Sequence, residues 1–310
     1  LLALGAMEPP TSFDATAVRD EKVKVLRALR HIGRDETVTG QYRAGAVEGA
    51  VVPGYDEELG KDSDTETFVA LKAHVDNWRW KGVPFYLRTG KRMDRRVSEI
   101  VVVFKEPPHA MFPGAEGGAT ANRLHICVQP DEGMRLHLTA KEPGPGGIRL
   151  RPVSLDLSYA TTFDQRSPEA YERLLMDVVR GNPTLFMRRD EVEAAWSWVA
   201  PILDRWAESP EAPRRYPAGT PGRFDSLGKQ SFGLELKGTV DGEDDAESLV
   251  SRCHPVLTTR NGRSPDSDLD DHLARDAREH AVVDQFQPAH AVVVDVGPAQ
   301  ESQRRVVTGT

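Results

Sequence analysis

The residues best placed to do chemistry lie in the basic run RTGKRMDRR at 88–96. Gly90 lets the backbone turn, and Lys91 and Arg96 follow it on the predicted loop. Two cations that converge from a strand end and its loop can hold a phosphorylated ligand by charge-assisted hydrogen bonds. The competing interpretation is a solvated basic turn, because lysine and arginine are usually surface residues. Lys91 and Arg96 are therefore the candidate binding residues.

Histidines and carboxylates raise the question of a metal site at two places. His125 and His137 fall on neighbouring predicted strands and could face each other, but both lie on the polar face and no third ligand is evident. An acidic run near the end of the chain lacks the spacing of a calcium-binding loop and is interpreted as solvated; it comprises Asp268, Asp270, Asp271 and His272. We predict no metal site.

The cysteines and a pair of tryptophans are assigned structural roles. Cys127 is expected to be a small packed residue in mid-strand. The sequence has only one other cysteine, Cys253, so no disulfide framework can form. Trp78 and Trp80 could form a stacking platform, but aromatic packing around a strand-to-strand turn is the expected role.

Hydrophobic periodicity predicts the elements that must position these residues. A three-four spacing predicts an amphipathic helix over 18–30, with Asp14 as N-cap and Gly33 as its stop. A glycine- and proline-punctuated loop is expected next, through GQYRAG and VVPGYDEELG. Alternating apolar residues then predict strands at 65–75, 83–88, 97–104, 123–129, 133–140 and 153–159.

Helices are predicted again after the strands, at 168–181 and at 189–206, the second kinked or broken before Pro201. Strands joined by short turns, without crossover helices, indicate an antiparallel or mixed sheet. The fold class is therefore α+β, with about six strands covered on one face by helices. Residues 221–310 are acidic, poorly periodic and expected to be mostly disordered, with the apolar piece AHAVVVDVG standing alone.

Composition excludes several classes of protein. Residues 221–310 hold 10 basic and 16 acidic side chains, a charge of −6, which leaves −2 of the total −8 for residues 1–220. A nearly neutral body with an acidic tail argues against nucleic-acid binding. No apolar run is long enough to span a membrane, and the start LLALGAMEPP lacks the basic flank of a secretory signal. We expect a cytoplasmic protein, and a start at Leu1 suggests a fragment.

Glycine-rich segments occur at 44–50, 113–118 and 142–147. None follows a strand and opens a helix with dinucleotide-binding spacing, so all three are predicted to be loops.

Over residues 1–219 the chain resembles glucose-6-phosphate dehydrogenase. The resemblance rests on long segments in family order, namely ALGAMEPP, VRDEKVKVLRALR, TETFVALKAHVDNWRWKGVPFYLRTGKRM, RLHICVQPDEG, YERLLMDVVRGNPTLFMRRDEVEAAWSWVAPIL and YPAG. It implies the carboxy-terminal substrate and dimerisation domain, a large and mostly antiparallel sheet covered by helices on one face, without the Rossmann-type domain. In the family pattern a lysine after Thr-Gly and a basic residue five positions later help to hold glucose 6-phosphate, which matches Lys91 and Arg96.

The resemblance also implies the reaction, which is NADP-linked oxidation of glucose 6-phosphate to its lactone at the entry to the pentose phosphate pathway. The family's catalytic histidine and coenzyme domain precede the segment that matches Leu1, so no catalytic or cofactor-binding residue is expected in this chain. We expect NADP to be bound mainly by the missing N-terminal domain, and a homo-oligomer formed through the sheet. Preference for NADP or NAD, oligomer size, regulation and the role of 220–310 are not determined by the sequence.

Some relatives carry a second, structural NADP on this domain. The matching positions read Val97, Val101, Cys127, His137 and Glu132, and only Glu132 agrees with such a site. We therefore expect no structural NADP. Two other interpretations remain open: a non-catalytic binding or dimerisation module that keeps the sheet, and a gene remnant with no stable function, suggested by the missing start and the tail after YPAG.

Overall fold

The computed structural model describes residues 1–107, 109, 121–145, 147–163, 170–209, 211–221 and 289–296. All of these residues belong to one compact unit. The predicted acidic run, Cys253 and the glycine cluster at 113–118 lie outside the described residues.

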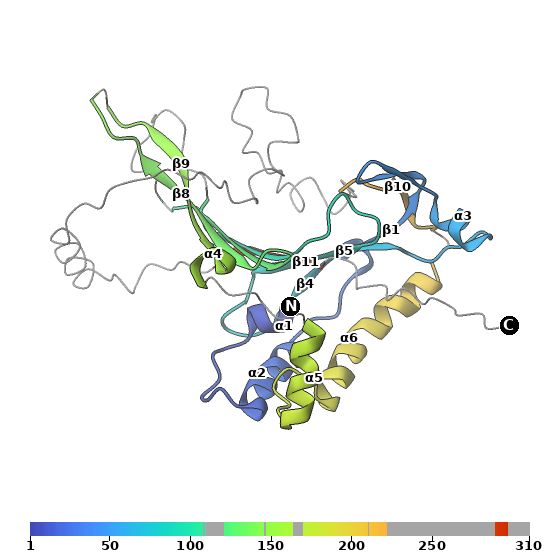
Figure 1. Cartoon of the computed structure of the whole chain (residues 1–310). Helices are drawn as coiled ribbons and strands as arrows, with labels where there is room; N and C mark the ends of the chain where they lie inside the picture. The colour runs from blue at the N-terminus through green and yellow to red at the C-terminus, as the bar shows by residue number, and fades with distance from the viewer. Residues whose placement is uncertain are drawn as a thin grey trace. The chain divides into compact units, whose positions relative to one another are not determined.

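The described part of the chain is built on a nine-stranded sheet with the order β10-β1-β4-β5-β11-β6-β7-β8-β9 (Figure 1). Two neighbouring pairs are parallel, β1 with β10 and β5 with β11, and the other pairs are antiparallel. The strands are β1 (Thr37–Arg43), β4 (Phe68–His74), β5 (Pro84–Gly90), β6 (Ser98–Phe104), β7 (Arg123–Gln129), β8 (Gly133–Lys141), β9 (Leu150–Ser158), β10 (Arg214–Pro217) and β11 (Ala289–Val296). The predicted mostly antiparallel α+β fold is confirmed.

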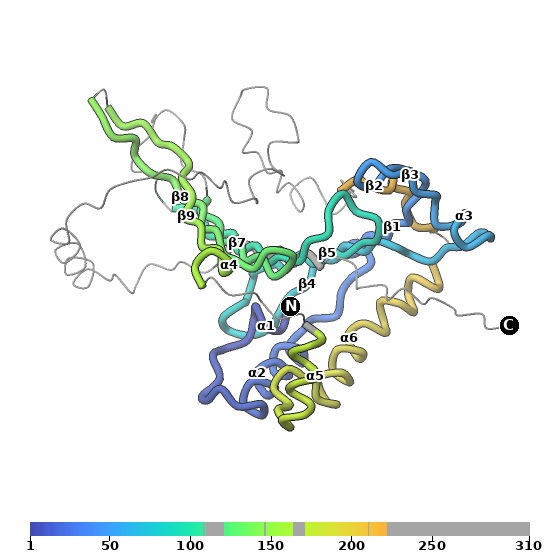
Figure 2. Tube along the Cα trace, in the orientation of Figure 1, coloured from blue at the N-terminus to red at the C-terminus, as the bar shows by residue number. Residues whose placement is uncertain are grey.

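The β7–β8 hairpin forms where alternation of apolar residues predicts it. Leu124 pairs with Leu136 and Ile126 with Met134, which keeps the apolar side chains on one face. Figure 2 shows β8 and β9 running together beyond the rest of the sheet.

Helices cover one face of the sheet, on the side where α1 (Leu2–Ala6), α2 (Ala15–Arg27), α5 (Ala170–Arg180) and α6 (Arg189–Ala207) gather in Figure 1. Asp14 caps α2 by accepting hydrogen bonds from the backbone N–H groups of Thr16 and Ala17, as predicted. The core between layers includes Ala6, Val25, Ala73, Phe85 and Ile202, each less than 5% exposed. Burial of these apolar side chains holds the helices to the sheet.

A second apolar cluster lies on the other face of β4. Phe68 and Ala70 alternate with the side chains that face the helices, so they point the opposite way. They pack with Val38 and Tyr42 of β1 and with Tyr216 of β10. One end of the sheet is therefore buried on both faces.

The segment predicted as a loop after the first helix is structured, so that prediction is wrong. It contains β1, a small hairpin of β2 (Gly45–Val47) and β3 (Ala50–Val52), and the short helix α3 (Tyr55–Leu59). The sequence TGQY did not predict strand β1, because a polar residue is not expected at a buried position. Gln41 is nevertheless fully buried, and its side-chain amide donates to the carbonyls of Ser63 and Thr65. Only tertiary contacts supply those partners.

Three smaller predictions also need correction. Helix α2 ends at Arg27, and Gly33 instead precedes the 3₁₀ helix η1 (Arg34–Glu36). Pro201 lies inside α6 without breaking it. Trp78 is fully exposed, whereas Trp80 packs edge-on against Phe85 at 5.1 Å between ring centroids. The short helices α1 and α4 (Tyr159–Phe163) were not predicted.

Candidate functional site

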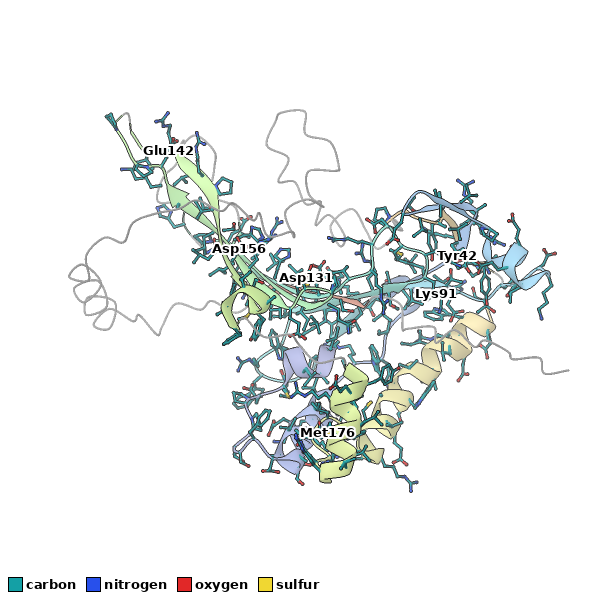
Figure 3. All side chains as sticks on the ribbon, viewed as in Figure 1. Tyr42, Lys91, Asp131, Glu142, Asp156 and Met176 are labelled. Carbon is teal, nitrogen blue, oxygen red and sulfur yellow. The ribbon has the colours of Figure 1, made fainter. Side chains whose placement is uncertain are left out.

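Lys91 and Arg96 lie on the loop 91–97 that joins β5 to β6, and both are exposed. Figure 3 places Lys91 at the end of the sheet that also holds Tyr42. The structure places both residues on the loop that the sequence predicted, and the convergence of their side chains stays a prediction. Whether they bind a ligand stays a prediction.

The start of this loop is held by backbone hydrogen bonds to the neighbouring strand region. The N–H of Lys91 donates to the Thr67 carbonyl at 2.8 Å, and the hydroxyl of Tyr216 donates to the Lys91 carbonyl at 2.7 Å. Tyr216 is 3% exposed, and its hydroxyl also lies 3.2 Å from that of Thr67. A buried, fully bonded hydroxyl fixes the position from which the Lys91 side chain extends.

Local conformation adds to this constraint. A Cβ added to Gly90 would come within 2.6 Å of Met93 Sδ and 2.8 Å of Phe68, so the turn needs glycine there. Arg92 adopts a left-handed φ of 53°. Its carbonyl accepts a hydrogen bond from the N–H of Gly219 at 2.8 Å.

The loop carries four basic residues, and carboxylate partners are described for Arg92 and Arg95. Arg92 Nη2 lies 2.8 Å from Glu58 Oε1, and Arg95 Nη2 lies 3.6 Å from Glu99 Oε1. Arg96 forms no ion pair with any residue that the structure describes. Arg96 therefore keeps its guanidinium available for an anionic ligand.

Two tyrosines next to the loop stay protonated over the physiological range. Burial raises the pKa of Tyr216 above its ordinary value. Burial, followed by the hydrogen bond to Glu58, raises the pKa of Tyr42, whose hydroxyl donates to Glu58 Oε2 at 2.5 Å. Both hydroxyls therefore act as donors.

Sequence reasoning missed that Thr67 and Tyr216 hold this loop. The motif YPAG was recognised, but Tyr216 lies 125 residues from Lys91 in sequence. No local pattern signals such a contact, and only an alignment of co-varying positions would have found it.

His125 and His137 do face each other, with ring centroids 4.9 Å apart. Burial first, then the charge on His137, lowers the pKa of His125 to about 4, and burial also lowers the pKa of His137. No group of three or more metal-ligating side chains occurs among the described residues. These shifts favour neutral imidazoles packed on the sheet.

Arginines surround this histidine pair, at positions other than those that match the second NADP site. Arg95, Arg123 and Arg135 all lower the pKa of His125 by their charge. Arg135 pairs with Asp156, whereas the buried Nε of Arg123 has no hydrogen-bond partner within the described structure. The expectation of no structural NADP stays untested, and any test must include these residues.

Comparison with known proteins gives consistent matches. A family model described as "Glucose-6-phosphate dehydrogenase, C-terminal domain" matches residues 1–227. Glucose-6-phosphate 1-dehydrogenase of Mycolicibacterium smegmatis is 62% identical over 231 residues, covering 73% of this chain and 46% of the relative. The enzyme of Rhizobium meliloti is 58% identical over 232 residues, covering 73% of this chain and 47% of the relative.

Solved structures agree with these sequence matches. A structure described as "Glucose-6-phosphate dehydrogenase in complex with its substrate glucose-6-phosphate" matches with a TM-score of 0.64 and 35% identity, over 72% of this chain and 45% of that one. The structure of glucose-6-phosphate 1-dehydrogenase from Mycobacterium avium matches with a TM-score of 0.58 and 36% identity, over 71% and 44%. The chain spans about half the length of the curated relatives it matches.

Proposed function

Because the chain belongs to the glucose-6-phosphate dehydrogenase family by its C-terminal domain, we propose that it forms the sugar-phosphate side of a dehydrogenase active site. The reaction is oxidation of glucose 6-phosphate to 6-phosphogluconolactone with NADP as hydride acceptor. The observation that supports this most directly is the anchored loop 91–97, which presents Lys91 and Arg96 at the end of β5.

In this proposal the chain binds and orients the sugar phosphate and performs no chemical step. Lys91 offers an ammonium with three donors, and Arg96 offers a planar guanidinium that can hold two oxygens of one phosphate. The fixed backbone at Lys91 limits the entropy lost when the ligand binds. Catalytic residues are placed outside this chain.

NADP does not fit the described residues as a hydride acceptor. The glycine cluster at 44–50 forms the turn between β2 and β3, with Gly49 at φ 81°, and the cluster at 142–147 joins β8 to β9. No strand, glycine turn and helix follow one another in the described ranges as a dinucleotide site requires. We propose that NADP binds elsewhere in the whole enzyme.

Binding of glucose 6-phosphate to this chain tests the proposal, and ligand-observed NMR is suitable for weak affinities. We expect saturable binding with a Kd in the millimolar range, equivalent to about 4 kcal/mol, and clearly weaker binding of glucose. Lys91→Ala and Arg96→Ala should each weaken binding about tenfold or more by removing a charge-assisted hydrogen bond.

Matched controls lie at the other end of β5. Lys81→Ala and Arg79→Ala remove exposed cations from the turn that precedes the strand, and both should leave binding unchanged. Absence of glucose 6-phosphate binding, or equal losses in all four variants, would refute the assignment of Lys91 and Arg96.

We also propose a homo-oligomer formed through the sheet. The support is exposed apolar surface on β9, where Leu155 is 61% exposed and Val153 40% exposed. Light scattering should give the mass of at least two chains, and Leu155→Asp should reduce it. A monomer at all concentrations would contradict this proposal.

The described residues contain no helix long and apolar enough to cross a membrane. A cytoplasmic location is consistent with this finding and stays part of the proposal.

A further inference from the structure

Strands β5 and β6 follow each other in sequence but are not paired in the sheet. Only residues 91–97 separate them, and β11 lies between them. Consecutive strands joined by a short loop usually pair directly. The family-matched part of the chain, residues 1–227, therefore contains two four-stranded half-sheets, β10-β1-β4-β5 and β6-β7-β8-β9, with an open position between them.

The connecting loop explains why β5 and β6 do not close on each other. Its first two residues are bonded to Thr67, Tyr216 and Gly219, all on the β4 and β10 side of β5. The chain leaves β5 in a direction set by these bonds. The two half-sheets are thereby held one strand position apart, about 10 Å between β5 and β6.

The two strands that border this position, β5 and β6, contribute side chains to the core. With β11 in place, Phe85 and Tyr86 on β5 are 0% and 7% exposed, and Ile100, Val101 and Val103 on β6 are each 7% exposed. Left empty, the position would leave two rows of backbone N–H and C=O groups unpaired between buried side chains, which is strongly unfavourable. The position therefore needs a strand.

We propose that the gap between β5 and β6 is a strand-acceptor site, and that residues 289–296 of this chain occupy it as a strand added from outside the family-matched domain. The segment AHAVVVDV has the composition such a site selects, since it is rich in β-branched residues and free of proline. Its role is to join the two half-sheets into one.

The register shows that the segment uses both edges. Val292 to Val296 pair with Phe85 to Thr89 in parallel on β5. On the other side, Ala289 and Ala291 to Val296 pair antiparallel with β6, with an irregularity between Ala289 and Ala291. Main-chain pairing on both edges is the mode by which extended peptides add to sheets.

Hydrogen–deuterium exchange on the full chain tests this proposal. Val293→Pro removes a backbone donor and fixes φ in the middle of β11, whereas Val306→Pro makes the same change outside the strand. We expect Val293→Pro to speed exchange of the amides of β5 and β6 about tenfold or more, and Val306→Pro to leave it unchanged. Unchanged exchange in Val293→Pro would overturn the proposal.

A peptide added in trans distinguishes loss of an acceptor-site strand from a general loss of stability as the cause of faster exchange. A synthetic peptide with the sequence of 289–296, added in excess to Val293→Pro, should restore protection of β5 and β6. A peptide of the same composition in scrambled order should restore much less. Failure of the native peptide, or equal rescue by the scrambled one, would overturn the acceptor site.

Discussion

At the scale of single residues, the proposed site depends on a hydroxyl that never reaches the ligand. Tyr216 donates to the Lys91 carbonyl and lies against Thr67, so it acts as a positioning residue. Tyr216→Phe should lower the free energy of unfolding by about 1 kcal/mol and weaken glucose 6-phosphate binding severalfold. Tyr55→Phe is the matched control, since Tyr55 makes a ring contact with Tyr42 at the same end of the sheet. Equal binding by Tyr216→Phe and the unmodified chain would contradict this role.

His125 gives the fold a predictable pH dependence. Its pKa of about 4 in the folded chain lies below the ordinary value of 6.5, so between these values the unfolded state binds a proton that the folded state does not. The free energy of unfolding should therefore fall as pH drops from about 6.5 to about 4, by about 2 kcal/mol after allowing for partial exposure. At pH 7 the His125 side chain is neutral in both states, so it causes no such loss of stability.

Chemical denaturation at pH 7 and pH 4.5 measures this dependence. His125→Gln should flatten the fall, whereas His31→Gln, at an exposed position, should retain it. The surrounding groups, namely Arg95, Arg123, Arg135, His137 and Asp156, must be kept constant in the comparison. A fall of equal size in both variants would show that other groups dominate.

At the scale of elements, helices α2 and α6 are joined by a buried ion pair. Lys22 Nζ lies 2.6 Å from Glu191 Oε1, with side-chain exposures of 14% and 1%. Lys22→Ala should lower the free energy of unfolding by about 3 kcal/mol, because it leaves the Glu191 carboxylate buried without its partner. Lys24→Ala should have little effect, because the Lys24 side chain is 69% exposed where it pairs with Glu21 of the same helix. Similar losses in both variants, measured by denaturation, would contradict this interpretation.

Elements were predicted correctly where a helix or strand buries one face, because its apolar residues then follow a regular spacing in the sequence. The β7–β8 hairpin and helix α6 show clear periods, so their bounds were found nearly to the residue. Strand β1 was not predicted because Gly40 and Gln41 are uncommon in strands. Its parallel partner β10 also lies far along the chain. The apolar piece at 289–296 was recognised, but its place beside β5 depends on contacts that no local pattern records.

At the scale of the whole molecule, we propose that residues 1–227 bind and position the sugar phosphate and that the chemistry comes from elsewhere. Lys91 and Arg96 were predicted from the sequence because their motif is compact. The residues that hold the Lys91 backbone, Thr67 and Tyr216, were not predicted, because these contacts form across the sheet. Apolar side chains on α5 remain exposed, with Val179 at 81% and Leu175 at 66%, consistent with a surface that another polypeptide segment covers.

A chimeric enzyme tests the central claim most directly. Residues 1–227 of this chain would replace the matching segment of the Mycolicibacterium smegmatis relative, and NADP reduction would be followed with glucose 6-phosphate. We predict turnover by the chimera, none by this chain alone, and a KM for glucose 6-phosphate raised about tenfold or more by Lys91→Ala or Arg96→Ala. A folded chimera without turnover, or variants with unchanged KM, would contradict the account.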